Sequence, residues 1–220
     1  MRQDGGIEAK PAGRRRPPLP VVILMLAAVF GAAGIAWSQR ELANPGERGA
    51  LAEARLETDP TRRNLVSEAE VRWHFEPNGA FGPEIVADVA IPERRQKIRF
   101  AIRRNTDDQL AASYIIEVVA EPPTFPGRSI AAIPLAYAKP SPDSRGKRLI
   151  GAAATVAENR FWFALSSERF DVNANRELLR GARVFELTLV YDTGRSAALL
   201  FEKGESGQRA FEAAAPLWDD

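Results

Sequence analysis

The chain has 220 residues, of which 30 are basic and 29 are acidic, so its formal net charge is only +1. A nearly balanced charge gives no overall field that would attract nucleic acid or an acidic substrate. Because the chain contains no cysteine, disulfides, thiolate metal sites and cysteine nucleophiles are excluded.

The first 18 residues are rich in glycine, proline and arginine and contain almost no side chain that could join a core. This composition predicts a disordered tail at 1–18, on the cytoplasmic side of a membrane. Three consecutive arginines, Arg14, Arg15 and Arg16, are expected to lie against anionic lipid headgroups. They are fewer than nucleic-acid binding usually recruits, so we expect no nucleic-acid partner.

An apolar segment without a charged side chain follows at 19–37. At about 1.5 Å per residue it would span roughly 28 Å as a helix, close to the hydrocarbon thickness of a bilayer. The segment predicts one transmembrane helix, with Pro20 in its first turn and Trp37 at the far interface. Small residues recur at four-residue spacing, which favours weak homo-oligomers through this helix; they are Ala28, Ala32 and Ala36.

The flanks of the apolar segment predict its orientation. Arg14–Arg16 precede it, whereas the first basic residues after it stand beside acidic ones. By the positive-inside rule, the N-terminus is cytoplasmic and the rest of the chain is periplasmic, at a bacterial inner membrane. A cleaved export signal is the alternative, because Gly34-Ile35-Ala36 offers small residues for cleavage before Trp37.

Residues 38–69 are charged, and Asn44-Pro45-Gly46 interrupts any helix that continues from the membrane. Within this segment, Gly49–Leu56 could form one or two helical turns. We interpret 38–69 as a stalk between the membrane and a periplasmic domain at 70–220.

From Glu70 onward the apolar residues alternate with polar ones. Val71, Trp73 and Phe75 share one face of a strand, and Arg72, His74 and Glu76 share the other. Turn residues separate this strand from eight further strand candidates, and two tight hairpins are marked at 157–160 and 192–195. The nine predicted strands are 71–76, 84–91, 97–103, 114–120, 130–137, 149–156, 161–166, 184–191 and 197–202.

Two short helices are predicted among the strands. The first, 173–180, has Asp171 or Asn173 as its cap. The second, 207–215, follows Ser206 as a cap and ends at Pro216. Many short strands with turn residues between them indicate a mainly β fold, an antiparallel β-sandwich or a sheet closed on itself. The expected fold class is an antiparallel β-sandwich with two short helices, preceded by one transmembrane helix.

A set of C-terminal motifs resembles alphaproteobacterial single-pass envelope proteins of unknown function, and is distantly similar to the invasion-associated locus B family. In those proteins a strand, a short helix, a hairpin with Gly-Arg and a final helix with Phe recur in this order. The resemblance implies a periplasmic β-sandwich module and carries over no activity. Its motifs are Phe161–Ser166, Leu178-Leu179, Phe185-Glu186-Leu187, Gly194-Arg195, Phe201–Gly204 and Ala210-Phe211.

No motif predicts a catalytic residue, a metal site or a cofactor. His74 is the only histidine and is expected to be an exposed strand residue. The segment that begins at Asp171 does not match a calcium-binding loop, which needs Gly at its sixth position and Glu at its twelfth. Here these positions are Arg176 and Ala182. Trp162 is the one candidate contact for a ligand or partner, since alternation points it away from the two phenylalanines beside it. Most carboxylates in the predicted strands are expected to be solvated; examples are Glu84, Asp88 and Glu117.

These observations favour a non-enzymatic, membrane-anchored envelope protein whose β domain binds or organises other envelope components. Its expected partners are the lipid bilayer and an envelope protein. A periplasmic domain that binds a small ligand or a glycan is the alternative, and would require a concave pocket. A hydrolase that uses carboxylates is the third hypothesis, and would require two acids converging in a cleft.

Overall fold

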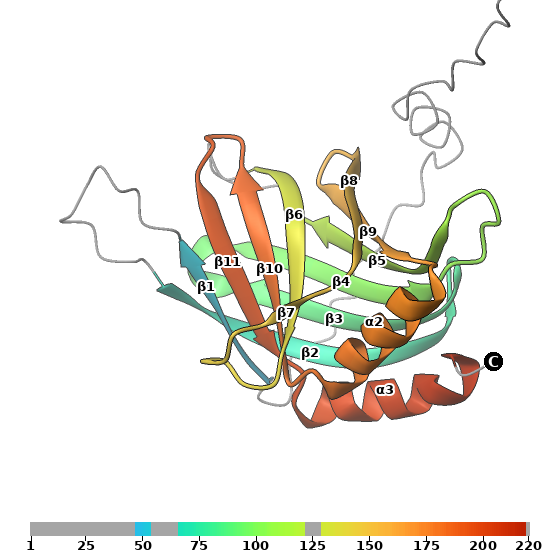
Figure 1. Ribbon diagram of the computed structural model, residues 1–220. Helices are drawn as coiled ribbons and strands as arrows, with labels where there is room; N and C mark the ends of the chain where they lie inside the picture. The colour runs from blue at the N-terminus through green and yellow to red at the C-terminus, as the bar shows by residue number, and fades with distance from the viewer. Residues whose placement is uncertain (1–46, 54–65, 122–128, 219–220) are drawn as a thin grey trace, which may run out of the picture. The chain divides into compact units, whose positions relative to one another are not determined.

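The computed structural model describes residues 47–53, 66–121 and 129–218. The chain divides into two units, 1–38 and 39–220, and every described residue belongs to the second unit. Within that unit, a curved antiparallel sheet is accompanied by two α-helices, α2 and α3 (Figure 1). The elements are β1 (Glu47–Glu53), β2 (Val66–Gly79), β3 (Gly82–Ile91), a 3₁₀ turn (Pro92–Arg94), β4 (Gln96–Arg104), β5 (Ala112–Ala120), β6 (Ile130–Lys139), β7 (Lys147–Arg148), β8 (Gly151–Ala157), β9 (Arg160–Ser166), α2 (Arg169–Gly181), β10 (Val184–Tyr191), β11 (Ser196–Glu202) and α3 (Gly204–Trp218).

The named strands form one sheet in the order β7-β6-β10-β11-β1-β2-β3-β4-β5-β9-β8. Every neighbouring pair of these strands is antiparallel. From β2 to β5 the strands follow one another as a meander. The last hairpin, β10–β11, inserts between β6 and β1, so the end of the folded unit completes the sheet beside its beginning.

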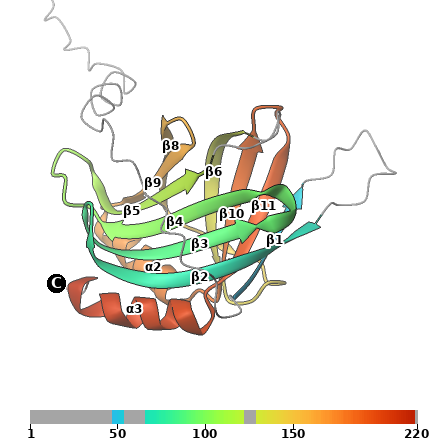
Figure 2. The same ribbon diagram turned by 180° about the vertical axis from the view of Figure 1, so that it is seen from behind.

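The sheet curls until its two halves face each other, and β2–β5 cross behind β6, β10 and β11 (Figures 1 and 2). Phe100 of β4 packs against Phe185 of β10 and Phe201 of β11, with ring centroids 5.5 and 5.2 Å apart. Near the sheet edges, the Thr155 hydroxyl of β8 donates to the Ala131 carbonyl of β6 at 3.2 Å. The fold is therefore mainly β, antiparallel and sandwich-like, with both layers drawn from a single continuous sheet.

Trp73 lies at the centre of the aromatic core. Its ring is 5.5–6.0 Å, centroid to centroid, from four phenylalanine rings contributed by β4, β10, β11 and α3. Its indole N–H donates to the Glu202 carbonyl at 2.8 Å, and its backbone N–H donates to the Ser206 hydroxyl at 3.2 Å. These bonds connect β2 to the junction between β11 and α3, so the helix is held against the sheet by both apolar packing and hydrogen bonds.

The prediction of a stalk at 38–69 is wrong at both of its described parts. Glu47–Glu53 forms β1, which pairs with β11 on one side and β2 on the other. β2 itself begins at Val66. Residues 47–53 include alanine, leucine and glutamate, which favour helices, but pairing with β11 and β2 overrides that preference.

The nine predicted strands are all present, and the structure adds β1 and the two-residue β7. The helix ends differ from the predicted ones. Asp171 and Asn173 lie inside α2 rather than capping it, and Glu168 precedes the helix without a side-chain cap bond. Ser206 lies inside α3, and Pro216 does not end that helix.

The predicted tail 1–18 and transmembrane segment 19–37 lie outside the described residues. In the part of the chain that the structure describes, no helix is long and apolar enough to cross a membrane.

Candidate functional site

Trp162 lies on the face of the sheet that points away from the aromatic core, as the alternation predicts. Its indole N–H donates to a Glu117 carboxylate oxygen at 2.9 Å. The Arg103 guanidinium lies 5.6 Å from the centre of the Trp162 ring and 4.6 Å from that of Phe81. Trp162 is therefore half-buried within a charged network. Arg14, Arg15, Arg16 and Trp37, the predicted membrane flanks, lie outside the described residues.

The network extends over five strands, and we call it the charged face. Its ion pairs run across strands: Arg99 lies 2.8 Å from Glu76 and 3.5 Å from Glu84, measured from the guanidinium to the carboxylate. Arg160 likewise lies 3.2 Å from Glu117. Its members are His74, Glu76, Glu84, Asp88, Arg99, Arg103, Glu117, Arg160 and Trp162.

The expectation that the strand carboxylates are solvated is wrong for two of the three. Glu84 and Glu117 are only 5% and 9% exposed. Alternation identified the face on which these acids lie, but it cannot show that long side chains from neighbouring strands gather over them. Asp88 is partly exposed and lies 3.7 Å from the His74 ring nitrogen.

Burial and ion pairing oppose each other in the acids of the charged face. Burial raises the pKa of Glu84 and of Asp88, and the nearby cations offset only part of that effect. For Glu76, burial acts in the same direction, but hydrogen bonds and charges from Arg99 and His74 outweigh it and lower its pKa. The acids converge, as a carboxylate hydrolase would need, yet Glu76, Glu84 and Glu117 are each paired with an arginine. This geometry is that of a cross-strand ion-pair network, which stabilises strand register.

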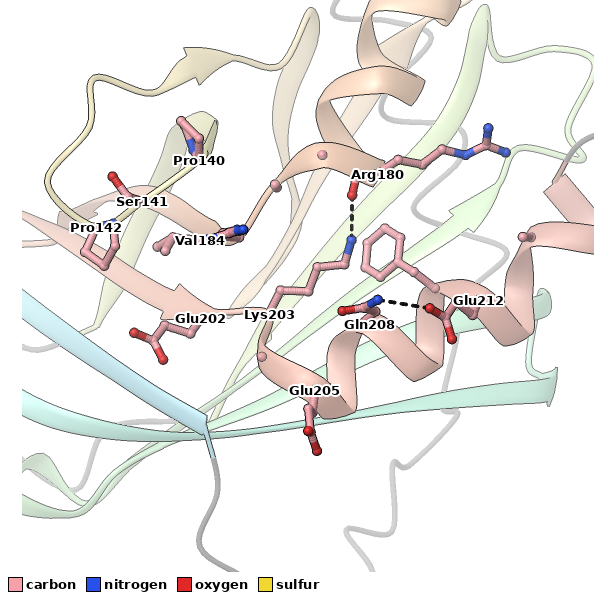
Figure 3. Close-up of a pocket in the computed structure, with 16 residues that line it drawn as sticks. Pro140, Ser141, Pro142, Arg180, Val184, Glu202, Lys203, Glu205, Gln208 and Glu212 are labelled. Carbon is pink, nitrogen blue, oxygen red and sulfur yellow. Dashed lines mark hydrogen bonds between the residues drawn. The ribbon is translucent and has the colours of Figure 1, made fainter.

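A cavity of about 810 Å³ opens elsewhere, where the end of α2, the start of α3 and the turn after β6 meet. Figure 3 shows the proline-containing turn on one side and α3 on the other, with Lys203 reaching between them. We call this cavity the Lys203 pocket. Its lining includes Pro140, Ser141, Pro142, Arg180, Gly181, Arg183, Val184, Glu202, Lys203, Glu205, Gln208, Phe211 and Glu212.

Lys203 directs its amine toward the end of α2 and is only 7% exposed. Its Nζ donates to the Arg180 carbonyl at 2.9 Å and to the Leu179 carbonyl at 3.4 Å. It also lies 3.7 Å from the centre of the Phe211 ring. Burial lowers the pKa of Lys203 to about 8, and the Glu212 charge opposes this shift. The pocket thus holds an amine that is bonded to neutral oxygens and less strongly basic than an ordinary lysine.

A buried asparagine in the middle of α2 holds this helix in place. Asn175 is fully buried, and its side-chain amide forms two 2.8 Å hydrogen bonds, with the N–H and the carbonyl of Ile150. The two bonds hold α2 against the segment before β8. They fix the position of the helix whose final carbonyls accept from Lys203.

In the sequence, Lys203 stood out only as part of the Phe201–Gly204 motif, and the pocket was not predicted. A signal was nevertheless present, because Ala197, Leu199 and Phe201 point inward and alternation continues to Lys203. α3 follows Lys203 directly, but the remaining walls come from 180–184 and 140–142, which lie much earlier in the sequence and which periodicity cannot bring to Lys203.

Within the described residues, no group of three or more His, Cys, Asp or Glu side chains could hold a metal ion. No protein-family model, curated protein or solved structure matches the chain. The resemblance to envelope proteins therefore stays a prediction from the sequence, and the site rests on its geometry alone.

Proposed function

We propose that this protein is a non-enzymatic, membrane-anchored binding module of the bacterial cell envelope, whose folded unit takes a small ligand into the Lys203 pocket. The observation that carries the binding role is the pocket itself, about 810 Å³ in volume and built around a buried amine. The anchor, the periplasmic location and the orientation rest on the apolar segment 19–37 and on the arginines that precede it.

The composition of the pocket supports a small ligand. Sites for small molecules typically measure about 300–1,000 Å³ and combine apolar walls with a few polar groups that fix orientation. Here Phe211, Val184 and two prolines supply apolar surface, whereas the polar groups include Lys203 and charged side chains of both signs. The walls come from separate elements, which Asn175 and the Trp73 hydrogen bonds hold in place.

Native mass spectrometry of the full chain, purified from its own membranes in detergent, tests this function. Gly181 lines the pocket, and a Cβ added there meets no atom within 4 Å, so Gly181→Trp places a large side chain at the pocket without backbone strain. Glu158→Trp, in the exposed β8–β9 turn, is the control. We expect a bound small molecule on the wild type and on E158W, and its loss from G181W. Equal occupancy of all three, or none on any, would contradict the proposal.

An envelope protein partner is the second candidate. Phe170, in the first turn of α2, is 91% exposed, which is unusual for a large apolar side chain. Replacing Phe170 with a photoreactive phenylalanine analogue should cross-link a protein partner in intact cells, whereas the same replacement at the exposed Glu177 should not. Identical cross-linked products at both positions would count against a partner that contacts Phe170.

A further inference from the structure

The amine of Lys203 stands apart from the other buried lysine of the folded unit. Lys139 is 8% exposed, close to the 7% of Lys203, but its Nζ lies 2.9 Å from the Glu186 carboxylate. Lys203 instead donates to two neutral carbonyls and faces the Phe211 ring. A carboxylate partner holds an amine in its charged form, and neutral partners in a buried site do so less.

We propose that the Lys203 amine captures small aldehydes or ketones covalently, as an imine, inside the Lys203 pocket. This inference rests on the proposed binding function and names the chemical class of the ligand. It follows from an amine that lines a cavity, is shielded from water and is bonded only to neutral acceptors among the described residues.

The protonation equilibrium of Lys203 also favours imine formation. Burial lowers the pKa of Lys203 to about 8, against an ordinary value of 10.5. At pH 7 such an amine has roughly 300 times as much neutral form as an ordinary lysine, because its pKa lies that much closer to the ambient pH. Only the neutral form has a lone pair available for attack, and desolvation of a lysine is one established route to such activation.

The reaction needs no oxidant or reductant. The Lys203 nitrogen attacks the carbonyl carbon of the ligand, the C=O π electrons move to oxygen, and a proton passes from nitrogen to that oxygen. The resulting carbinolamine then loses its oxygen as water while the C=N bond forms. One amine and one carbonyl compound therefore give one imine and one water.

The surroundings of Lys203 suit the protonated imine as well as the free amine. An iminium retains one N–H, which can donate to the Arg180 carbonyl at 2.9 Å while the longer 3.4 Å contact to Leu179 is given up. Its positive charge remains over the Phe211 ring, where a cation is attracted by the negative face of the aromatic system. The lining carries charges of both signs, Arg180 and Arg183 against Glu202, Glu205 and Glu212, so these charges favour neither an acidic nor a basic ligand.

The test treats the full chain in detergent with 4-carboxybenzaldehyde and sodium cyanoborohydride, which reduces an imine to a stable secondary amine. Besides its N-terminal amine, the chain has only five lysines, Lys10, Lys97, Lys139, Lys147 and Lys203, so peptide mass spectrometry assigns every adduct. At pH 7 we expect Lys203 to react at least about tenfold faster than Lys97, Lys139 or Lys147, because a larger share of its amine is neutral than in an ordinary lysine.

Lys203→Arg keeps the charge and the ability to donate to the carbonyls but cannot form an imine. We expect it to retain the fold, to bind the probe without reaction and to leave the remaining lysines labelled slowly. Labelling of the wild type that is equal at all lysines, or absent at Lys203, would overturn covalent capture. If Lys203 is not labelled selectively but G181W still loses a native ligand, the pocket binds its ligand noncovalently. The two proposals can therefore fail separately.

Discussion

Gly207 lies where α3 meets both Trp73 and Lys203. A Cβ at this position would come within 2.6 Å of the Lys203 Cγ and 3.1 Å of the Trp73 ring. Neither neighbour can move easily, because the indole is hydrogen bonded and packed among phenylalanine rings and the Lys203 amine is held by α2. The absence of a side chain at Gly207 thus allows α3 to approach the sheet.

We expect Gly207→Ala to lower the free energy of unfolding by about 1–3 kcal/mol, the usual cost of overpacking a filled core. The helix propensity of alanine opposes this loss but is worth no more than about 1 kcal/mol. Urea denaturation of the full chain measures the difference. Gly181→Ala, where the new methyl group meets open space, is the control and should change stability little.

Glu76 and Glu84 share Arg99 as a partner, yet their pKa values move in opposite directions. The pKa of Glu76 is below its ordinary 4.5, so its stabilising effect is present above that pH and is lost as the pH falls through its folded pKa. The pKa of Glu84 is above 4.5. Protonation of Glu84 therefore stabilises the fold at low pH, and this stabilisation is lost as the pH rises through its folded pKa.

The two acids should therefore respond differently to neutralisation. At pH 7, Glu76→Gln should reduce the free energy of unfolding by up to about 1 kcal/mol, since this partly exposed pair is screened by solvent. Glu84→Gln should change it less, because it removes a charge that burial disfavours and leaves Arg99 with Glu76, while the buried Arg103 loses its 3.9 Å contact with Glu84. Denaturation curves at pH 7 and pH 4 check both; a larger loss in E84Q than in E76Q at pH 7 would refute the assignment.

At the scale of the element, α2 depends on one side chain more than on its caps. No side-chain bond caps its start, whereas the buried Asn175 forms two hydrogen bonds with Ile150. Asn175→Ala leaves the Ile150 N–H without its partner and a gap in place of the buried amide, which should cost about 1–3 kcal/mol; the Ile150 carbonyl keeps its bond from the Ser166 N–H. Asn173→Ala, on an exposed position of the same helix, should be nearly neutral.

Hydrogen exchange distinguishes a local from a global effect of Asn175→Ala. If the two bonds hold α2 against the sheet, amides of α2 should lose more protection than those of β3 or β4. The Lys203 pocket should also open, because its carbonyl acceptors belong to the end of α2. Uniform loss of protection across the sheet would show that Asn175 supports the fold as a whole.

The elements that the sequence predicted are those in which local pattern and tertiary environment agree. In β2, Val71, Trp73 and Phe75 do point toward the core, and alternation alone was sufficient to find this strand. β1 was missed because Gly49–Leu56 contains good helix formers, and its strand pairing depends on β11, far along the chain. The Lys203 pocket was missed for the same reason, since its walls are assembled by tertiary contacts.

At the scale of the whole molecule, the sheet joins residues from both ends of the folded unit. β1 pairs on one side with β2, the next strand along the chain, and on the other side with β11, near the end of the chain. Residues 47–53 therefore belong to the folded unit and not to the predicted stalk.

The predicted orientation can be tested in cells with the full chain. Protease added to spheroplasts should remove a C-terminal epitope and leave an N-terminal one intact, because Arg14, Arg15 and Arg16 favour the cytoplasmic side. Replacing all three with glutamate should reduce the fraction in this orientation, whereas replacing them with lysine should preserve it. The N-terminus of the mature protein gives an independent readout, since an uncleaved anchor retains residues 1–36. A mature chain beginning at Trp37 would instead make 19–37 an export signal, and the Lys203 pocket would then belong to a protein free in the periplasm.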